Sequence, residues 1–428
     1  MANYLKLFED ENAYSAFTGT SAYVTPNVSV CSGGGGSIFY NPYEYNPANE
    51  YFTTVAKSNG TIRFNGSASG TVTNKLSYSL NGGSWSTPSQ TPSVSVSAGD
   101  KVLWKGECIP NSSAGIGNFR QTKTDFDIEG NVMSLLYGDG FKGKTSLVGN
   151  NNAFRDLFYD SFLNSAENLS LPATTLAQSC YVRMFYECPL LTTAPSVLPA
   201  TALTQSCYSN MFKGCTSLTK APALPATTLA QTCYQNMFNG CTSLTTAPEL
   251  PAETLADYCY ATMFESCIKL ATAPELPAEA LAPGCYSGMF SGCTSLTTAP
   301  VLPAKTLARA CYESMFDSCT SLATATELPA TTLANSCYSK MFSGCTSLTS
   351  APELPATTLT QYCYYYMFFG CGKINSITCL ATDISASNCT TCWLYGVAST
   401  GTFKKAASMT SWTSGANGIP DGWTTIDK

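Results

Sequence analysis

Cysteine is the residue type whose spacing in this chain most resembles a chemical site. Cys389 and Cys392 form a CxxC motif, which is typical of redox centres and zinc sites. The alternative is a repeated pattern, because Cys389 falls 26 residues after Cys363 and Cys392 stands where other units carry methionine. No second pair has zinc-ligand spacing, so we favour the repeated pattern and expect no metal and no catalytic residue.

The spacing of the 21 cysteines also argues against a disulfide scaffold. Cys207 and Cys215, like the paired cysteines of most other units, are eight residues apart, which on a helix is about 12 Å and too far for a disulfide. A buried free cysteine behaves as a small apolar side chain. We therefore expect a ladder of reduced, buried thiols, and the odd number implies at least one free thiol.

Composition excludes several classes of function. Histidine is absent, which removes Ser-His-Asp and Cys-His catalysis and histidine-containing zinc sites. A formal charge of −6 without a basic run argues against nucleic acid and anionic membranes as partners. No apolar stretch of about 18 residues exists, so we expect no membrane insertion. Glu9, Asp10 and Glu11 stand where a secretory signal is apolar, so a chain starting naturally at Met1 is not expected to use general secretion.

Glutamates recur in one slot of successive units. Like charges at the spacing of stacked strands repel each other, and a calcium ion would relieve that repulsion. Solvent and salt relieve it as well, so we predict no cofactor. The row consists of Glu249, Glu275, Glu327 and Glu353.

All these residues belong to a repeated unit of 26 residues. The unit reads roughly LPATTLAxxCYxxMFxGCTSLTxAPE. A fixed period of 20–50 residues is typical of a solenoid, in which each unit buries its apolar face only against its neighbours. Such a stack offers a long surface and no cleft, which favours recognition over catalysis. The cysteines that open the phrase CYxxMF mark the period at Cys207, Cys233, Cys259, Cys285, Cys311, Cys337 and Cys363.

One unit predicts one helix and one short strand. Apolar pairs recur every four residues from Leu229 to Cys241, which indicates the apolar stripe of a helix, and Gly240 suits its end. Apolar residues at intervals of three over 244–250 indicate a short strand or extended turn. Strands stack at about 4.8 Å and helices at about 8–10 Å. We therefore expect a curved stack with strands on the concave side and helices on the convex side.

The expected fold is multidomain. Segments 60–64, 76–80 and 94–104 alternate apolar and polar residues between turn signals, which indicates a small β-sandwich ahead of the repeats. The four glycines at 33–36 lack a following Lys-Ser/Thr, so we read them as a surface loop. The predicted parts are a lead-in for attachment over 1–50, a β-sandwich over 51–150, a curved α/β leucine-rich-repeat solenoid of eight clear units plus degenerate capping units over 151–397, and a C-terminal cap over 398–428.

Only positions that vary between units can encode specificity, and a helix would place them outward. The alternative is neutral drift of a solvated face. The last regular unit carries four aromatic side chains where other units carry mostly small or polar residues. Burial beneath the following cap, with Trp393, Trp412 and Trp423, is the explanation we favour; a stacking platform for sugars or an oligomer contact is the alternative. The candidate ligand-binding residues are Asn210, Asn236, Lys340, Tyr362, Tyr365, Tyr366 and Phe369.

The phrases MFSGCTSLTSAPELPATTL and CYSKMF resemble the BspA-like leucine-rich repeats of bacterial surface proteins. The resemblance covers about 153–397 and implies that the stretch from Met341 to Leu348 joins helix to strand. Segments 22–29, 38–41 and 401–423 resemble flanks seen in proteins of gut Bacteroidales and their phages.

The resemblance implies a non-enzymatic adhesion or receptor-recognition protein. The favoured setting is a phage virion, as a tail or head appendage, because a particle assembled in the cytosol needs no export signal. A bacterial cell-surface adhesin and a structural spacer without a ligand are the alternatives. The expected partners are a bacterial surface glycan or protein and, through the N-terminal region, other virion proteins, with a homo-oligomer as a further option.

Overall fold

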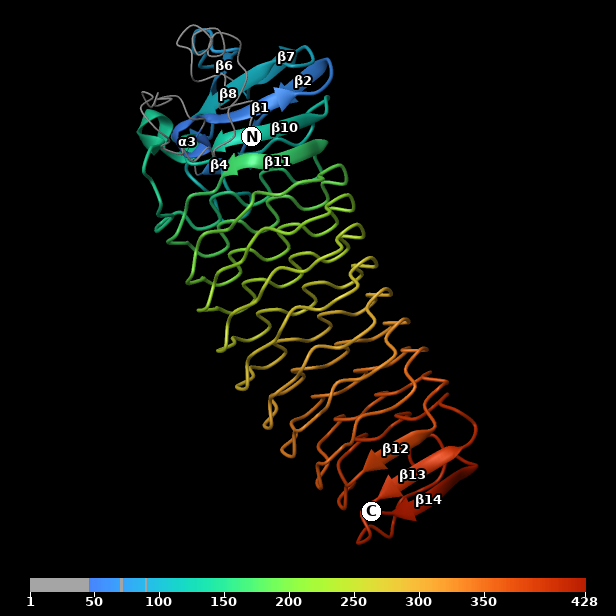
Figure 1. Cartoon of the computed structure of the whole chain (residues 1–428). Coiled ribbons are helices and arrows are strands. Elements are labelled where there is room, and N and C mark those ends of the chain that lie inside the picture. The colour runs from blue at the N-terminus through green and yellow to red at the C-terminus, as the bar shows by residue number, and fades with distance from the viewer. Residues whose placement is uncertain (1–45, 70–71, 89–90) are drawn as a thin grey trace, which may run out of the picture.

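The computed structural model describes residues 46–69, 72–88 and 91–428, and the predicted lead-in lies outside them as far as residue 45. A strand-rich N-terminal region sits on one end of a long stack of coils, and three short strands close the other end (Figure 1). The N-terminal strands are β1 (Phe52–Ala56), β2 (Gly60–Arg63), β3 (Asn65–Gly66), β4 (Ala68–Ser69), β5 (Val72–Thr73), β6 (Ser77–Leu80), β7 (Ser93–Val96), β8 (Lys101–Lys105), β9 (Gly117–Asn118) and β10 (Phe126–Asn131).

The N-terminal region and the repeats share one sheet. Its strand order is β11-β10-β1-β8-β6, where β11 (Leu163–Ser170) already belongs to the stack and pairs in parallel with β10. Three two-stranded ribbons, β2-β7, β3-β9 and β4-β5, complete the region. The described helices are short and flank this sheet: η2 (Pro47–Asn49), α3 (Ser134–Tyr137) and η3 (Gly138–Phe141).

The predicted helix in each repeat is wrong: the described residues contain no helix between 142 and 428. Backbone N–H groups instead donate alternately within a coil and to the next coil. Met211 N–H donates to Tyr208 O at 3.2 Å, and Phe212 N–H donates to Met237 O at 2.9 Å. The chain therefore forms consecutive turns, and backbone hydrogen bonds join each coil to the next.

Left-handed backbone at every fourth residue makes this turn pattern. In one coil Ser206, Asn210 and Gly214 have φ of 55°, 56° and 77°. An α-helix turns 100° per residue, so apolar pairs at a strict interval of four would drift about 40° per repeat and leave one face. A four-residue turn has no such drift, and it keeps every apolar pair of the unit directed inward.

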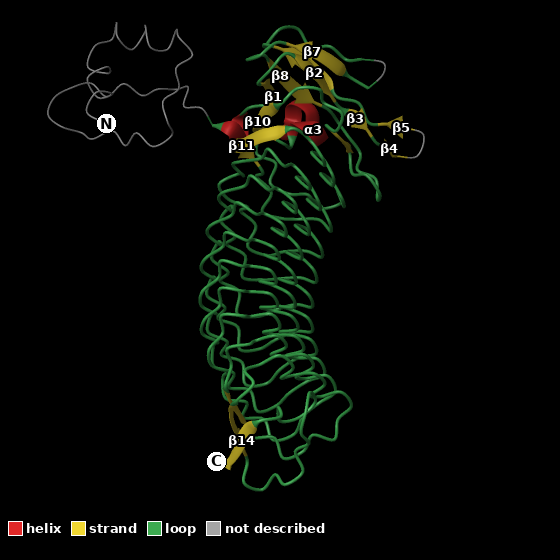
Figure 2. Ribbon diagram, turned by 90° about the vertical axis from the view of Figure 1, so that its right-hand side faces the viewer, coloured by secondary structure: helices red, strands yellow, loops and turns green. Residues whose placement is uncertain are grey.

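The strong curvature that we expected for the stack depended on helices on its outer side. The structure has hydrogen-bonded turns there instead, so this reason for curvature is absent. Helices would have held the outer side at about 8–10 Å per unit, whereas the turns are joined by direct hydrogen bonds between adjacent coils. Figure 2 accordingly shows a nearly straight stack. On the other side of each coil the predicted strands are reduced to isolated parallel bridges, such as Thr193↔Lys220 and Thr298↔Thr324.

Two ladders of stacked aromatic rings run through the core. Neighbouring tyrosines from Tyr181 to Tyr364 lie 5.6–6.2 Å apart between ring centroids. Phenylalanines from Phe158 to Phe368 stack beside them, for example Phe238 on Phe264 at 5.6 Å. The ladders and the buried Met, Leu and Cys side chains form one continuous core.

The second cysteine of each unit has a specific bond in this core. The Cys241 Sγ–H group donates to Phe212 O of the preceding coil at 3.1 Å, and Cys267 repeats this bond to Phe238 O. The expectation of free thiols is confirmed for the described cysteines, which form no disulfide. The thiol thus fills a small apolar space and satisfies a backbone carbonyl.

The C-terminal cap covers the end of the ladders. Trp393 stacks on Tyr364, and Trp412 stacks on Trp393 at 5.6 Å. The indole N–H of Trp393 donates to Gly418 O, and that of Trp423 donates to Ala398 O. The cap sheet is parallel, in the order β12 (Ser376–Cys379), β13 (Gly401–Lys405) and β14 (Trp423–Asp427).

Candidate functional site

The variable positions between the conserved CY and MF pairs lie on the outer turn face of the stack. In each pair the second residue has a left-handed backbone, including Asn210, Asn236, Lys340 and Tyr366. Asparagine adopts this conformation more readily than most residues, because its short polar side chain bonds locally. Backbone geometry therefore accounts for part of the variation that we attributed to ligand specificity.

Two of the predicted ligand residues are occupied by scaffold contacts. Asn210 Nδ2 donates to Ser209 Oγ at 2.7 Å. Asn236 Oδ1 accepts from Thr262 Oγ1 of the next coil at 2.7 Å. Both are half-buried, whereas Lys340 is exposed. The structure places the two asparagines several coils away from the aromatic candidates, so these residues do not form one site.

The four aromatic candidates do come together, and they are joined by a fifth residue. Tyr362 and Tyr365 lie 5.4 Å apart between ring centroids, and Tyr365 and Tyr366 lie 4.4 Å apart. Tyr366 contacts Phe369 at 5.1 Å, and Phe369 stacks on Tyr395 at 5.4 Å. We call these five residues the aromatic patch. Tyr395 belongs to the capping unit, one period after Phe369.

Burial beneath the cap, the favoured explanation for these aromatics, is only partial. The four residues from 362 to 369 are half-buried, and Tyr395 is 57% exposed. Trp393 and Trp412 of the cap stack instead on the tyrosine ladder of the core. The cap therefore closes the interior of the stack and leaves the aromatic patch on the outer turn face.

The backbone beneath the patch is costly for tyrosine. Tyr362 and Tyr366 have φ of 57° and 54°, at positions where most other units place Ser, Thr, Asn or Gly and the remaining units place Tyr258, Ala310, Arg183 and Lys340. A left-handed backbone costs a residue with a Cβ roughly 1–2 kcal/mol. The same backbone recurs at the equivalent positions of the other coils, so it belongs to the turn pattern and does not by itself mark a binding site.

The CxxC motif is divided between the core and the surface. Cys389 is buried and its Sγ–H donates to Ile384 O at 3.3 Å, whereas Cys392 is the described cysteine that is not buried. Cys392 lies one period after Tyr366, and its thiol interacts with the Tyr366 hydroxyl and raises the pKa of Tyr366. Among the described residues, no group of three His, Cys, Asp or Glu side chains is arranged to hold a metal.

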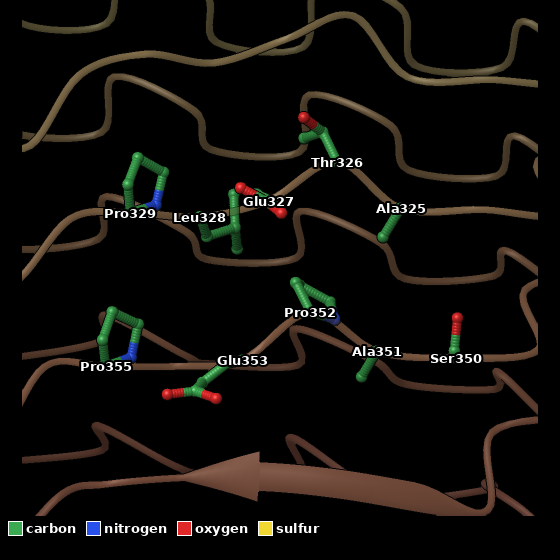
Figure 3. A pocket seen from close by; sticks show the side chains of 10 residues that line it. All are labelled: Ala325, Thr326, Glu327, Leu328, Pro329, Ser350, Ala351, Pro352, Glu353 and Pro355. Atoms are coloured by element: carbon green, nitrogen blue, oxygen red, sulfur yellow. The ribbon is translucent and has the colours of Figure 1, made fainter.

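The glutamate row lies on a different face and borders a small hollow. Glu327 and Glu353 flank a depression of about 290 Å³ that prolines and alanines line (Figure 3). Thr326 interrupts the row of prolines there, since the neighbouring units carry Pro300 and Pro352. Glu353 forms an ion pair with Lys428. The hollow therefore lies where Thr326 replaces the proline that the neighbouring units carry.

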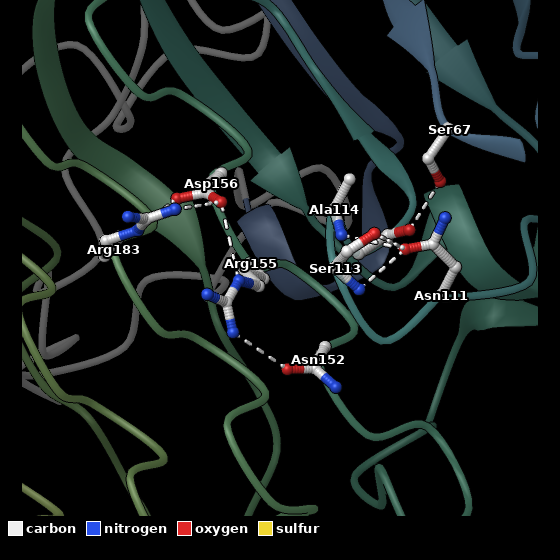
Figure 4. Close-up of polar contacts among 9 residues, drawn as sticks. Ser67, Asn111, Ser113, Ala114, Asn152, Arg155, Asp156 and Arg183 are labelled. Carbon is white, nitrogen blue, oxygen red and sulfur yellow. Dashed lines mark hydrogen bonds and ion pairs between the residues drawn. The ribbon is translucent and has the colours of Figure 1, made fainter.

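At the N-terminal end the turn face carries an ionic junction. Asp156 accepts two hydrogen bonds from Arg183, each of 2.7 Å, and Arg155 lies 3.5 Å from the same carboxylate (Figure 4). Tyr159 stacks on Tyr186 at 5.4 Å. These contacts join the first coils to each other.

Sequence reasoning missed Tyr395 and Cys392 as members of the patch surface. Both stand one period after a residue of the patch, at 369 and 366 respectively, and this signal was available in the sequence. The expectation that Cys392 stands at the methionine position was wrong and hid this signal, because Cys392 holds the position of Tyr366 and Trp393 holds that of Met367.

Comparison with known proteins identifies the repeats. A model of the BspA type leucine-rich repeat region matches residues 151–271 and 264–393, with six copies. The chain belongs to the BspA-type leucine-rich repeat family. This confirms the resemblance seen in the sequence. A solved leucine-rich repeat protein from Bacteroides ovatus is 15% identical, with 64% of this chain and 77% of that chain covered and a TM-score of 0.26.

A search of curated proteins gives no match. No helix in the described part of this BspA-type chain is both long and apolar enough to cross a membrane.

Proposed function

We propose that this BspA-type protein is a non-enzymatic recognition protein that binds a surface ligand through the aromatic patch. The observation that carries the proposal is the continuity of five aromatic side chains on the outer turn face. Aromatic side chains that remain partly exposed and touch one another in series are typical of contact surfaces. Most other units carry small or polar residues at the same positions.

The chemistry of the cysteines supports recognition over catalysis. Burial raises the pKa of the ladder thiols, to about 12 for Cys259 and Cys371, so these side chains are protonated at neutral pH. The thiolate is the nucleophile and the metal ligand, and a buried thiol with a raised pKa is inert. The ladder therefore serves packing.

The proposed setting is a phage particle, in which the N-terminal region attaches to other virion proteins and the C-terminal end faces the ligand. The support is the resemblance of the flanking segments to proteins of gut Bacteroidales and their phages. Residues 362–395, which carry the aromatic patch, lie at the end of the stack remote from the N-terminal sheet, so the patch would be presented away from the attachment point (Figure 1). A bacterial cell-surface adhesin is the second candidate, since the same presentation serves a cell.

Cell binding tests the proposal. The full chain is labelled and titrated onto intact gut Bacteroidales cells from many strains, because β10 and β11 share a sheet and fragments would cut it. The patch variant takes the residues that other units carry at these positions. The matched control takes equivalent changes in a mid-array unit. The patch variant is Y362S, Y365S, Y366N and F369S, and the control is T232S, Q235S and N239S.

Saturable binding by the wild-type chain and the control, lost in the patch variant, is the expected result. Absence of binding across all strains favours a structural spacer and overturns the proposal. Equal binding by wild type and patch variant places recognition elsewhere and also overturns it.

A further inference from the structure

We infer that the aromatic patch takes a neutral oligosaccharide, with one sugar ring stacked on the outer face of Tyr395. This inference rests on the proposed function and names the chemical class of the ligand. Four features of the described residues carry it: a free aromatic face, the polar rim of the patch, its small area and its weak charge.

Tyr395 ends a row of stacked side chains. Its ring lies nearly parallel to Phe369, at an interplanar angle of 14°, and the described residues place no aromatic ring on its other face. The side chain is 57% exposed although it is a large aromatic. A free π face next to a packed one is pre-organised to stack, because Phe369 already fixes the ring from behind.

The other rings of the patch offer edges and hydroxyl groups. Tyr362 and Tyr365 meet at 83°, and Tyr365 and Tyr366 meet at 56°, so the surface is ridged and not flat. Each tyrosine hydroxyl both donates and accepts a hydrogen bond. A sugar ring presents apolar C–H faces and a rim of hydroxyl groups. The aromatic rings of the patch match the C–H faces, and the tyrosine hydroxyl groups match the hydroxyl rim.

The area of the patch favours an oligosaccharide over a folded protein. A fully buried aromatic side chain covers about 150–250 Å², and four of the five are half-buried here. The patch therefore exposes a few hundred Å², at most on the order of 500 Å². A specific protein interface covers about 800 Å² on each partner. A few sugar rings cover the patch completely, and a protein would need additional surface that the polar neighbouring coils supply poorly.

The charge around the patch favours a neutral ligand. No patch residue carries a charge at neutral pH, and Lys340 is the charged residue at the equivalent positions of the preceding coil. The whole chain has a formal charge of −6, which repels polyanions. An acidic polysaccharide would require several cations at the site.

Cys392 provides a readout within the site. Its thiol interacts with Tyr366, and the other described cysteines are buried. Cys31 lies outside the described residues, so a C31S background assigns the surface reaction to Cys392. A sugar lying from Tyr395 across Tyr366 covers this thiol and slows its alkylation by iodoacetamide.

The experiment uses polysaccharide released from the strains to which the full chain binds. The released material is separated by anion exchange into a neutral flow-through and an acidic retained fraction. Each fraction is tested for protection of Cys392 in the C31S chain, in Y395S and in Y186S. Y186S is the matched control, because Tyr186 occupies the same row and stacks in the same way at the other end.

The neutral fraction is expected to slow alkylation of Cys392 at least about tenfold at saturation. Y395S is expected to need about tenfold more of that fraction, since one aromatic stacking contact contributes roughly a factor of ten, and Y186S is expected to behave as the parent. Protection by the acidic fraction alone overturns the inference. So does patch-dependent cell binding that survives periodate oxidation of the sugars and is lost on protease treatment, although the proposed function then stands. Equal cell binding by the wild-type chain and the patch variant overturns the proposed function itself.

Discussion

Alkaline pH should unfold this protein, because the thiols buried in its core stay protonated in the folded state and ionise once the chain unfolds. Burial raises the pKa of eight cysteines from an ordinary value near 9 to about 12: Cys108, Cys180, Cys188, Cys259, Cys293, Cys363, Cys371 and Cys379. In the unfolded chain these thiols ionise from about pH 9, whereas in the folded chain they remain protonated. The unfolded state then binds fewer protons, so the free energy of unfolding falls as pH rises from about 9 to about 12.

The size of the effect is comparable with the whole stability of a protein. At pH 10, one unit above the ordinary thiol pKa, each of the eight groups lowers the free energy of unfolding by about 1 kcal/mol. Together they lower it by on the order of 10 kcal/mol, and folded proteins have only about 5–15 kcal/mol. The ladder tyrosines, whose pKa burial also raises, add to this effect at higher pH. We therefore expect cooperative loss of structure near pH 10.

Circular dichroism from pH 6 to pH 12, in the presence of a reductant, measures this transition. Return to pH 7 should restore the spectrum, which separates thiol ionisation from chemical damage. The absence of histidine predicts a flat response between pH 6 and pH 8. A protein still folded at pH 11.5 would refute the reasoning, because ionisation of the unfolded thiols would by then remove more free energy than a folded protein has.

Three substitutions test the core and the turn face by denaturant unfolding. Tyr234→Phe should raise the free energy of unfolding by about 1 kcal/mol, because the buried Tyr234 hydroxyl has no hydrogen-bond partner; destabilisation would mean that the hydroxyl is bonded. Phe238→Ala should cost about 3–5 kcal/mol by opening a cavity between two stacked neighbours, and an effect below 1 kcal/mol would contradict a packed ladder. Tyr366→Asn should raise stability by up to about 1 kcal/mol by relieving the left-handed tyrosine, and a loss would show that the ring stabilises the coil.

The sequence was sufficient for the stack and its core. The 26-residue period predicted the repeated coils, and the invariant apolar letters predicted the residues that the structure buries, including Cys233, Tyr234, Met237 and Phe238. These predictions succeed because each unit can bury its apolar residues only against the next unit. The N-terminal strands near 60–64, 76–80 and 94–104 are also present, because alternation is a direct signal of a half-buried strand.

The helix prediction failed because a strict period of four residues was treated as the 3.6-residue period of an α-helix. Apolar pairs in one unit recur at intervals of four residues without the occasional interval of three that a helix requires. Gly214, Gly240 and Gly344, together with Asn210 and Asn236, occupy the left-handed positions and marked them in advance. Tyr362 and Lys340 obscured that signal, because neither residue favours such a backbone.

The location of the aromatic patch could not be read from the sequence alone. The four aromatic residues of the last regular unit are compatible with burial under a cap and with exposure. The positions of the cap tryptophan side chains decide between the two. Trp393 continues the inner tyrosine ladder, since it aligns in space with Tyr364, and this leaves Phe369 to pair outward with Tyr395. The period already pairs Phe369 with Tyr395, but the stacking of Trp393 on Tyr364 follows only from the three-dimensional course of the last coil.

The measurement that tests the account most directly is the equilibrium binding of the full chain to responsive Bacteroidales cells, compared with its Y362S, Y365S, Y366N and F369S variant at matched thermal stability. The account predicts saturable binding by the wild-type chain and at least about a hundredfold weaker binding by the variant, since several aromatic contacts are lost together. Equal affinities of the two folded proteins would contradict the claim that this surface recognises the ligand.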